Sequence, residues 1–411
     1  MDVSYKMSDA LTGKMVLRYH LDKKLGSGVF GSVYKCTDVL TREVRAIKLL
    51  EKNNRENQSN FTNEVASHQI LSEYPDCNAY VLCMYGFGTY YSRSYENNLN
   101  RVRAIQAAGK TVQDELNQLE AIPLKNSSYI KTTIATTKTI LRDRIEEILL
   151  AKEELGLQDS KPVVGDYLFI VTELMDDDLT GIMDLIHKDK ITYSIRVIDF
   201  IIGTLVEGLK YIHDSGLTHA DIKPENILWK IEESDGAPIT IEQCLQDPAL
   251  AEEYLRIVYG DLGFTCIDDA DRDSYEEKIR SCDSEKGTPI YLSPELATRS
   301  YRGNVSLAEA HAADVWALAV TLWKLVWGDE PPYLEGLETY EDLVKKLRSL
   351  RPDFISEYIE EGKLPLDIEI LFKGMFILDP EDRVTIDEIY EFLEESKARK
   401  ATEGNIEIGE T

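Results

Sequence analysis

A glycine-rich stretch near the N-terminus has residue types suited to binding phosphate. Gly26-Ser-Gly28-Val-Phe-Gly31 matches G-x-G-x-x-G, a pattern found in several nucleotide-binding folds and also by chance. A dinucleotide-binding turn needs a helix to begin at the third glycine, but residues 32–37 alternate like a strand. A Walker A loop needs lysine directly after the last glycine, where this chain has Ser32. What remains is a hairpin whose backbone amides can close over phosphates, or an ordinary turn.

Two charged residues that follow this hairpin could hold a phosphate group. In Arg45-Ala-Ile-Lys48, Ala46 is small enough to admit a flat base, and Lys48 alternates onto the same face of the strand. Glu64 belongs to the helix predicted next, and an ion pair with Lys48 would hold the lysine against the α- and β-phosphates of a nucleotide. A solvated lysine at a sheet edge is the alternative interpretation.

The segment His219-Ala-Asp-Ile-Lys-Pro-Glu-Asn226 makes the chain similar to eukaryotic-type protein kinases. In the catalytic loop of that family a base Asp and a metal-binding Asn stand five positions apart, as Asp221 and Asn226 do here. Lys223, two residues after the Asp, could neutralise charge on the phosphoryl group during transfer. The resemblance covers about residues 19–395, outside the insertions.

Further motifs of the family follow in the family's order. They are Asp261-Leu-Gly263, which resembles the metal-binding Asp-Phe-Gly, Gly287-Thr-Pro-Ile-Tyr291 with Ser293-Pro-Glu295, which resemble the end of an activation segment, then Asp314-Val-Trp316 and Arg383. The resemblance implies a structural ion pair between Glu295 and Arg383. The Lys-Pro-Glu and Gly-Thr-Pro motifs resemble the serine/threonine group, with dual specificity left open.

The resemblance implies a bilobal α+β protein-kinase fold, with ATP and Mg²⁺ bound between an antiparallel-sheet N-lobe with one main helix and a mostly helical C-lobe. The family's catalytic roles fall on Asp221, Lys223, Asn226, Lys48 and Glu64, and its metal ligands on Asn226 and Asp261. Its nucleotide-binding positions fall on Leu25, Gly26, Gly28, Gly31, Val33, Ala46, Lys48, Thr172, Glu173, Met175 and Leu228. Among these, Val33, Ala46 and Leu228 would sandwich adenine, and Thr172 would be the gatekeeper.

Two positions beside the catalytic motifs depart from the family pattern. Ala220 stands where the family usually has the arginine that pairs with phosphate on the activation segment. We therefore expect activity that does not depend on activation-segment phosphorylation. Leu262 replaces the Phe of Asp-Phe-Gly, which is a conservative packing change. Thr288 is expected to contact Asp221 and Lys223.

Three functions are compatible with these motifs. The presence of the full catalytic set favours an active serine/threonine protein kinase over an ATP-binding pseudokinase scaffold; the set is Lys48, Glu64, Asp221, Asn226 and Asp261. The segment Gly287–Glu295 argues against a kinase of small molecules, because it resembles the segment that shapes a peptide site.

These residues require a strand-rich N-terminal part followed by a helical part. Periodicity predicts strands within residues 19–50 and a helix from Asn60 to Tyr74, with Asn60 as its cap. Residues 89–165 separate two apparent neighbouring strands, and their apolar spacing predicts a helical hairpin that turns at Pro123 and Asn126–Ser128. We expect an N-terminal extension (1–18), an N-lobe (19–173, insertion 89–165), a C-lobe (174–396, insertion 230–256 with a short helix around 241–255) and a polar tail (397–411).

Charge and composition limit the partners. The 411 residues include 74 Asp and Glu against 46 Lys and Arg, a net charge of −28. This field repels phosphate backbones and anionic membrane surfaces, so we expect no nucleic-acid or membrane partner. Acidic residues also crowd the activation segment between Asp268 and Glu285, so we expect basic protein substrates. The 89–165 insertion could regulate catalysis, dock a protein partner or be an inert loop.

The cysteines and the absence of targeting signals bear on location. The six cysteines contain no C-x-x-C pair and are too sparse for a disulfide scaffold, so a reducing compartment is expected. The opening residues contain no apolar signal-peptide region, and no apolar stretch approaches the roughly 20 residues of a membrane-spanning helix. We expect a cytoplasmic or nuclear protein.

Overall fold

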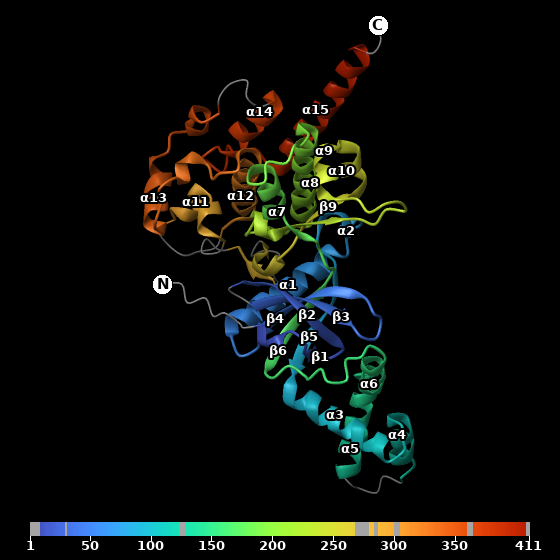
Figure 1. Cartoon of the computed structure of the whole chain (residues 1–411). Coiled ribbons are helices and arrows are strands. Elements are labelled where there is room, and N and C mark those ends of the chain that lie inside the picture. Colours follow the sequence, from blue (N-terminus) through green and yellow to red (C-terminus); the bar gives the residue numbers. More distant parts are fainter. Residues whose placement is uncertain are drawn as a thin grey trace. The chain divides into compact units, whose positions relative to one another are not determined.

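The computed structural model describes residues 9–28, 31–122, 128–267, 279–282, 287–299, 305–359 and 365–407. The chain divides into two compact units (Figure 1). The sheet unit comprises Met1–Phe61 and Met84–Leu174, and the helical unit comprises Thr62–Cys83 and Met175–Thr411. Among the described helices, none combines the length and the apolar character needed to cross a membrane.

Six antiparallel strands form the sheet of the sheet unit, in the order β1-β2-β3-β4-β6-β5. They are β1 (Met15–Val16), β2 (Tyr19–Gly28), β3 (Gly31–Asp38), β4 (Val44–Glu51), β5 (Met84–Tyr91) and β6 (Asp166–Thr172). The strands predicted within 19–50 are therefore confirmed as β2, β3 and β4. Strand β3 buries every second residue, as expected for a strand with one face on a core.

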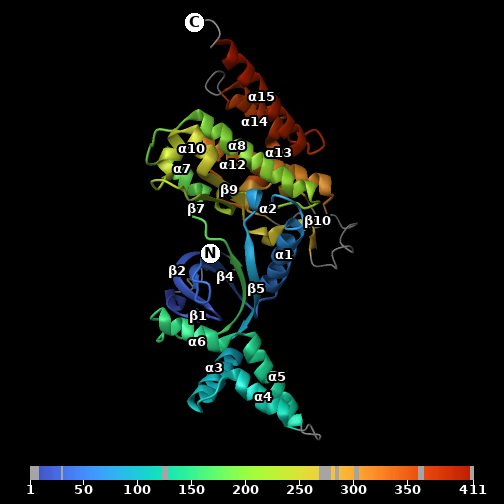
Figure 2. The same ribbon diagram turned by 90° about the vertical axis from the view of Figure 1, so that its right-hand side faces the viewer.

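Four helices follow β5 where the sequence predicted a hairpin of two (Figure 2). They are α3 (Ser92–Ala107), α4 (Val112–Ala121), α5 (Ser128–Arg142) and α6 (Ile145–Glu154). The predicted turn of one helix against another is present, because α4 and α5 pack together on either side of residues 123–127. The prediction was incomplete for two reasons. Polar residues dominate α3 and hid its buried face of Tyr95, Leu99, Val102 and Ile105, and Arg144, with a φ of 53°, separates α5 from α6. The proposed turn at 123–127 lies outside the described residues.

The apolar stripe of this insertion is buried against the sheet of its own unit. Tyr95, Leu99 and Val102 belong to the same apolar core as Leu21 and Tyr34 of the strands. The Tyr95 hydroxyl also donates to the carbonyl of Leu17 at 3.0 Å. The insertion is therefore part of the folded core of the sheet unit.

Helix α1 (Arg55–Leu71) begins five residues before the predicted start. The side-chain oxygen of Asn54 accepts hydrogen bonds from the backbone N–H groups of Glu56 at 2.8 Å and Asn57 at 3.3 Å. Asn54 is therefore the N-cap, and the prediction that Asn60 caps the helix was wrong. The early start places one more turn in front of the apolar positions that defined the predicted helix.

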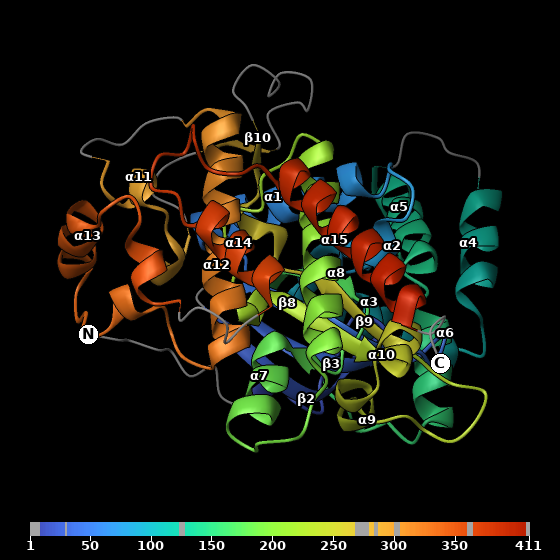
Figure 3. The ribbon, with the colours of Figure 1, turned by 90° about the horizontal axis from the view of Figure 1, so that it is seen from above.

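The helical unit packs around two long helices, α8 (Ile195–Asp214) and α12 (Leu307–Trp327). Helix α12 buries nearly all of its central residues, so it lies inside the core of the helical unit. Helix α15 (Ile386–Glu407) packs along α8, and α14 (Leu366–Met375) packs against α12 (Figure 3). The remaining elements include α2 (Cys77–Tyr80), α7 (Leu179–His187), α11 (Pro294–Ala297), α13 (Tyr340–Ser349) and the antiparallel strands β7 (Asp177–Asp178), β8 (Ile227–Ile231) and β9 (Leu255–Tyr259).

Two short helices occupy the 230–256 segment, where one was predicted. They are α9 (Ile241–Gln246) and α10 (Pro248–Tyr254), and the carboxylate of Asp247 between them caps α10 by accepting from the N–H of Ala249 at 3.0 Å. Cys244 and Leu245 are fully buried in the core of the helical unit.

A two-residue parallel ladder joins β10 (Cys266–Ile267) to β11 (Arg280–Ser281). Beside the ladder Cys266 forms a disulfide with Cys282, 16 residues later, with their Cα atoms 4.9 Å apart. This bond departs from the expectation of cysteines in a reducing compartment. The spacing of the cysteines in the sequence did not indicate the pair, because the ladder brings the two residues together. Among the described residues, Cys36, Cys77, Cys83 and Cys244 are free thiols.

Candidate active site

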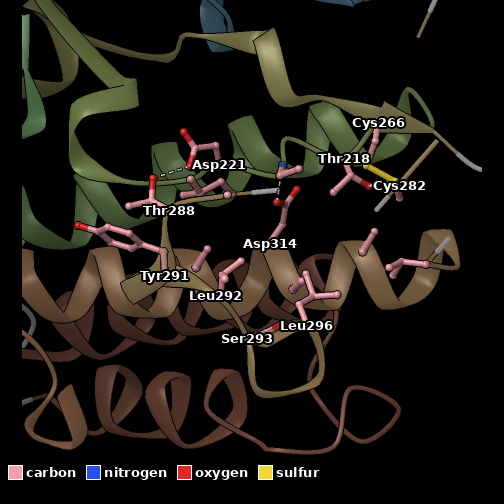
Figure 4. Close-up of a pocket in the computed structure, with 17 residues that line it drawn as sticks. Thr218, Asp221, Cys266, Cys282, Thr288, Tyr291, Leu292, Ser293, Leu296 and Asp314 are labelled. Atoms are coloured by element: carbon pink, nitrogen blue, oxygen red, sulfur yellow. Dashed lines mark hydrogen bonds between the residues drawn. A yellow bond between two sulfur atoms is a disulfide. The ribbon is translucent and has the colours of Figure 1, made fainter. Parts of the chain in front are cut away.

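Four predicted residues of the helical unit form one hydrogen-bond network. The hydroxyl of Thr288 donates to Oδ1 of Asp221 at 2.8 Å and accepts from Nζ of Lys223 at 2.8 Å. Lys223 Nζ also contacts Oδ2 of Asp221 at 2.8 Å. The amide of Asn226 donates to Oδ2 and to the backbone carbonyl of Asp221, at 2.9 Å and 2.8 Å. Figure 4 shows Thr288 directed at Asp221. The contacts expected for Thr288 are confirmed.

The buried carboxylate of Asp314 on α12 holds the start of the catalytic loop. It accepts from the backbone N–H groups of His219 at 2.7 Å and Ala220 at 2.9 Å, and its Oδ2 lies 3.1 Å from Nε2 of His213. Burial alone would raise the pKa of Asp314. The hydrogen bond from His213, the positive charge of the neighbouring histidines and the His219 N–H outweigh burial and lower that pKa. The carboxylate therefore stays ionised and fixes the loop that presents Asp221.

Ala220 has a φ of 63°, which is unusual for a residue with a side chain. The two hydrogen bonds that surround this peptide, from His219 and Ala220 to Asp314, hold it in that conformation. Its methyl group packs against an apolar cluster formed by Cys266, Cys282, Val305 and Ala310. Position 220, which departs from the family pattern, therefore makes an apolar contact in this structure.

Asp261 lies at the start of the 3-10 turn Leu262–Phe264 and has a φ of 51°. The preceding Gly260 donates its N–H to the carbonyl of Asn226 at 2.8 Å and accepts from the His219 ring at 3.1 Å. Because the Asn226 amide nitrogen is engaged by Asp221, its oxygen is the group available to a cation. The carboxylate of Asp261 and the oxygen of Asn226 are hard oxygen donors that suit Mg²⁺, which uses few protein ligands together with phosphate oxygens. Among the described residues, no group of three or more His, Cys, Asp and Glu forms a metal cluster.

A buried network on α1 was missed by the sequence analysis. The side chain of Asn63, 2% exposed, donates to the carbonyls of Thr265 at 2.8 Å and Gly263 at 3.2 Å, and accepts from the N–H of Arg280 at 2.9 Å. Ser67 donates to the carbonyl of Asn63 at 2.8 Å and also contacts the Thr265 hydroxyl. An asparagine one position before Glu64 carries no recognisable signal, because its partners are backbone groups about 200 residues away.

In the sheet unit the predicted phosphate-binding residues lie on β2, β3 and β4. Gly26 and Gly28 pair with Val33 and Gly31 across the hairpin. A Cβ atom at Gly31 would lie 2.3 Å from the carbonyl oxygen of Leu49, so only glycine fits there. Residues 29 and 30 at the hairpin tip lie outside the described residues.

The residues predicted around adenine follow the register of the same sheet. Lys48 lies opposite Val33 on one side and Ile170 on the other, and Ala46 lies opposite Thr172. Leu25 on β2 is 47% exposed and Glu173 is 8% exposed. These placements are compatible with the roles that the resemblance implies.

Glu64, Met175 and Leu228 belong to the helical unit, whereas Lys48, Val33 and Ala46 belong to the sheet unit. The Lys48–Glu64 ion pair and the sandwich of adenine by Val33, Ala46 and Leu228 therefore stay predictions. Within the helical unit, the Leu228 side chain packs over Gly260, where a Cβ atom would lie 3.0 Å from it.

The ion pair implied for Glu295 and Arg383 is present and buried. The two terminal guanidinium nitrogens of Arg383, Nη1 and Nη2, donate to the carboxylate of Glu295 at 2.8 Å and 2.9 Å. The Arg383 side chain is 0% exposed and also donates to the carbonyls of Ile377 and Ala312. This pair links the end of the activation segment to the loop before α15, which fits a folding role.

Sequence comparison identifies the family to which this chain belongs. The chain belongs to the protein kinase family, because the family described as "Protein kinase domain" matches residues 102–392, more than half of the chain. The match confirms the bilobal α+β kinase fold expected from the sequence. It begins within α3, so the glycine-rich stretch and Lys48 lie outside the matched residues.

Several of the matched relatives are protein kinases. The chain is 27% identical to the serine/threonine-protein kinase ksg1 of Schizosaccharomyces pombe over 46% of this chain and 26% of that protein. It is 26% identical to the serine/threonine-protein kinase CHK1 of Mycosarcoma maydis over 62% of this chain and 32% of the relative. It is 27% identical to the DNA damage response protein kinase DUN1 of Saccharomyces cerevisiae over 45% of this chain and 32% of the relative. These matches support a eukaryotic-type serine/threonine protein kinase, and they span a third or less of each relative's length.

Proposed function

We propose that this chain is an active serine/threonine protein kinase that transfers the γ-phosphoryl group of ATP to protein hydroxyls. The observation that carries the proposal is the network that joins Asp221, Lys223, Asn226 and Thr288. Phosphoryl transfer needs positioning and charge neutralisation more than covalent help from the protein. This network supplies a fixed carboxylate with a cation beside it.

The site residues predicted from the sequence have distinct roles in the proposal. Asp221 accepts the proton of the substrate hydroxyl, and Lys223 neutralises charge on the transferred phosphoryl group. Lys48, held by Glu64, clamps the α- and β-phosphates, and the glycines of the β2–β3 hairpin cover them. Asn226 and Asp261 would hold Mg²⁺, which supplies neutralisation of the phosphate charge when it is bound.

An arrayed peptide library incubated with ATP and Mg²⁺ tests the proposal. We expect phosphate on serine and threonine, and a loss of several orders of magnitude for Asp221→Asn with the fold intact. Asp189→Asn, at an exposed position, is the matched control and should keep full activity. ATP binding by the wild-type chain without transfer to any peptide or protein would support the alternative, an ATP-binding pseudokinase scaffold.

The chemistry around Ala220 supports activity without a phosphate on the activation segment. An alanine supplies no guanidinium for such a phosphate, and here it packs on apolar side chains. Chain treated with phosphatase should therefore transfer phosphate without a lag at its first turnovers. A long lag that prior phosphorylation removes would contradict this part of the proposal.

A protein partner at the 89–165 insertion is a further part of the proposal. The apolar face of α3 is covered by the sheet unit itself, so a partner would have to use exposed side chains. Tyr129 on α5 is 77% exposed and Leu150 on α6 is 55% exposed. Replacement of both by serine should remove such a partner and leave turnover of short peptides unchanged.

A further inference from the structure

The Cys266–Cys282 disulfide lies beside the catalytic loop of the helical unit. Thr218 donates its N–H to the carbonyl of Cys266 at 2.9 Å, and Cys266 donates back to Thr218 at 3.1 Å. Thr218 is three residues before Asp221 in the chain. Figure 4 shows Thr218 next to the sulfur–sulfur bond, on the same loop that presents Asp221. One end of the disulfide is thus fixed to the catalytic loop.

The other end of the disulfide, Cys282, precedes Thr288 in the sequence. Cys282 donates its N–H to the carbonyl of Ile267 at 3.2 Å, and its own carbonyl accepts from Val305 at 3.0 Å. Thr288 follows six residues after Cys282 and binds Asp221 and Lys223. The disulfide therefore joins Cys266, five residues after Asp261 in the sequence, to Cys282, six residues before Thr288.

Among the described residues, the noncovalent contacts between the two arms that carry Cys266 and Cys282 include the β10–β11 ladder and Asn63. The β10–β11 ladder has only two residue pairs, and so short a ladder contributes little stability by itself. Asn63 binds both arms, at Thr265 and Arg280, one or two residues before each cysteine. Closing the intervening stretch costs chain entropy, and a covalent bond removes much of that cost from the folding equilibrium.

The surroundings of the disulfide suit an apolar anchor and not a phosphate. A cavity of about 40 Å³ adjoins it and is bordered by Ala220, Asp221 and Thr288. The described residues that line this cavity include no lysine or arginine. Cys266 and Cys282 are 3% and 2% exposed and pack with Val305 and Ala310.

We propose that the Cys266–Cys282 disulfide positions the activation segment for phosphoryl transfer, taking the place of a contact between phosphate and arginine, and that its reduction lowers activity. The inference rests on the proposed kinase function. The two cysteines are positioning residues, because they act through Thr288 and the catalytic loop. A dithiol such as dithiothreitol supplies two electrons and two protons. The sulfur–sulfur bond breaks, both cysteines become thiols, and the reagent is oxidised to its cyclic disulfide.

The test compares the oxidised full-length chain, the same chain after reduction, and two variants. Cys266→Val with Cys282→Val keeps the apolar packing and removes the bond. Cys77→Ser with Cys83→Ser keeps the bond and changes two free thiols outside the site. Peptide mapping without reductant establishes the state of the bond in each sample. Steady-state kinetics then measures kcat and KM for a peptide and for ATP.

We expect kcat/KM for the peptide to fall about tenfold or more in the reduced chain and in the valine variant, because misplaced catalytic groups lose rate steeply. Reoxidation should restore the wild-type chain and not the valine variant. The serine variant should match wild type and respond to the reductant in the same way. Full activity of the valine variant, or a mapped chain whose two cysteines never pair, would overturn the proposal.

A second measurement separates this proposal from the proposed function. Hydrogen exchange of the peptide that contains Gly287–Leu292 reports how firmly this segment is held, whether or not the chain transfers phosphate. We expect faster exchange there after loss of the bond, while α8 stays protected. If the oxidised wild type transfers no phosphate, the kinase proposal fails. If hydrogen exchange at 287–292 is the same with and without the disulfide, the positioning role of the disulfide is refuted and the kinase proposal is unaffected.

Discussion

The hydroxyl of Thr288 donates a hydrogen bond of 2.8 Å to Oδ1 of Asp221, and this contact joins the end of the activation segment to the proposed base. The same hydroxyl accepts from Lys223. Thr288 therefore contacts both the carboxylate of Asp221 and the ammonium group of Lys223, which also contact each other directly at 2.8 Å. Both residues belong to the helical unit.

Removing this hydroxyl should slow catalysis. Thr288→Val keeps the shape of the side chain but cannot donate to Asp221 or accept from Lys223, so we expect kcat to fall about ten- to a hundredfold. Thr288→Ser keeps the hydroxyl and should retain most of the activity. Steady-state kinetics with a fixed peptide measures both variants. Equal kcat values for the valine and serine variants would contradict the role given to the hydroxyl.

The buried pair Arg383–Glu295 should dominate the stability of the helical unit. Arg383→Met leaves the Glu295 carboxylate buried without its partner, so the free energy of unfolding should drop by about 3–5 kcal/mol. All four tryptophans of the chain, at positions 229, 316, 323 and 327, lie in this unit. Urea unfolding followed by tryptophan fluorescence therefore reads the helical unit directly.

A surface pair provides the control for that experiment. Lys345 and Glu341 lie one turn apart on α13, and their side chains are 68% and 79% exposed. Lys345→Met should change the free energy of unfolding by about 0.5 kcal/mol or less. Equal effects of the two substitutions would show that the buried pair has no special role.

Acid should destabilise the helical unit through His311. Burial, followed by the positive charge of His213, lowers the pKa of His311 from 6.5 to about 4, against the opposing effects of Asp314, the Leu217 carbonyl and Asp387. The rings of His213 and His311 stack 3.7 Å apart. Between pH 6.5 and about pH 4, His311 is protonated in the unfolded chain and neutral in the folded chain. Stability is therefore complete above pH 6.5 and falls as the pH decreases towards 4, by up to about 3 kcal/mol.

Urea unfolding at several pH values measures this effect. His311→Gln should flatten the pH dependence between 6.5 and 4, whereas His20→Gln, in the sheet unit, should leave the profile of tryptophan fluorescence unchanged. A wild-type profile that is flat over this interval would show that His311 does not carry the predicted penalty.

The sequence predicted those parts of the site that local motifs define. Asp221, Lys223 and Asn226 were identified because the catalytic loop is a short continuous stretch with fixed spacing, and Thr288 because it belongs to the Gly-Thr-Pro motif. Asn63 and the Cys266–Cys282 bond were missed, because their partners are brought together by folding and carry no local pattern. Helix α3 was missed for a related reason, since its four buried residues stand among polar ones and pack on a sheet that the sequence does not place beside them.

Basic peptides should be preferred at low ionic strength. The acidic run that first suggested this, within 268–278 and 283–286, lies outside the described residues. A second observation supports it. Burial, followed by the negative charges of Glu225, Glu330 and Asp221, raises the pKa of Tyr291. Carboxylates therefore surround this end of the activation segment. One cation, Lys324, also contacts the Tyr291 hydroxyl at 3.0 Å.

The preference should weaken as salt screens it over a Debye length of about 10 Å at 0.1 M. Glu225→Gln should reduce the ratio of kcat/KM for matched basic and acidic peptides by about three- to tenfold at low salt. Glu341→Gln, on the exposed face of α13, is the control. Equal turnover of the two peptides at low salt would refute the preference.

We expect helix α3 of the 89–165 insertion to contribute to the stability of the sheet unit. Leu99 on α3 is buried in the core that α3 shares with the strands of the sheet unit, so Leu99→Ala should lower the free energy of unfolding of that unit by about 2–5 kcal/mol. Tyr129→Ala, at an exposed position on α5, should have little effect on stability. Because the tryptophans report only the helical unit, hydrogen exchange of β3 and β4 is the suitable measurement. Unchanged protection of β3 and β4 in Leu99→Ala would show that the insertion folds independently of the sheet, and it would return the segment to the role of a separate docking element.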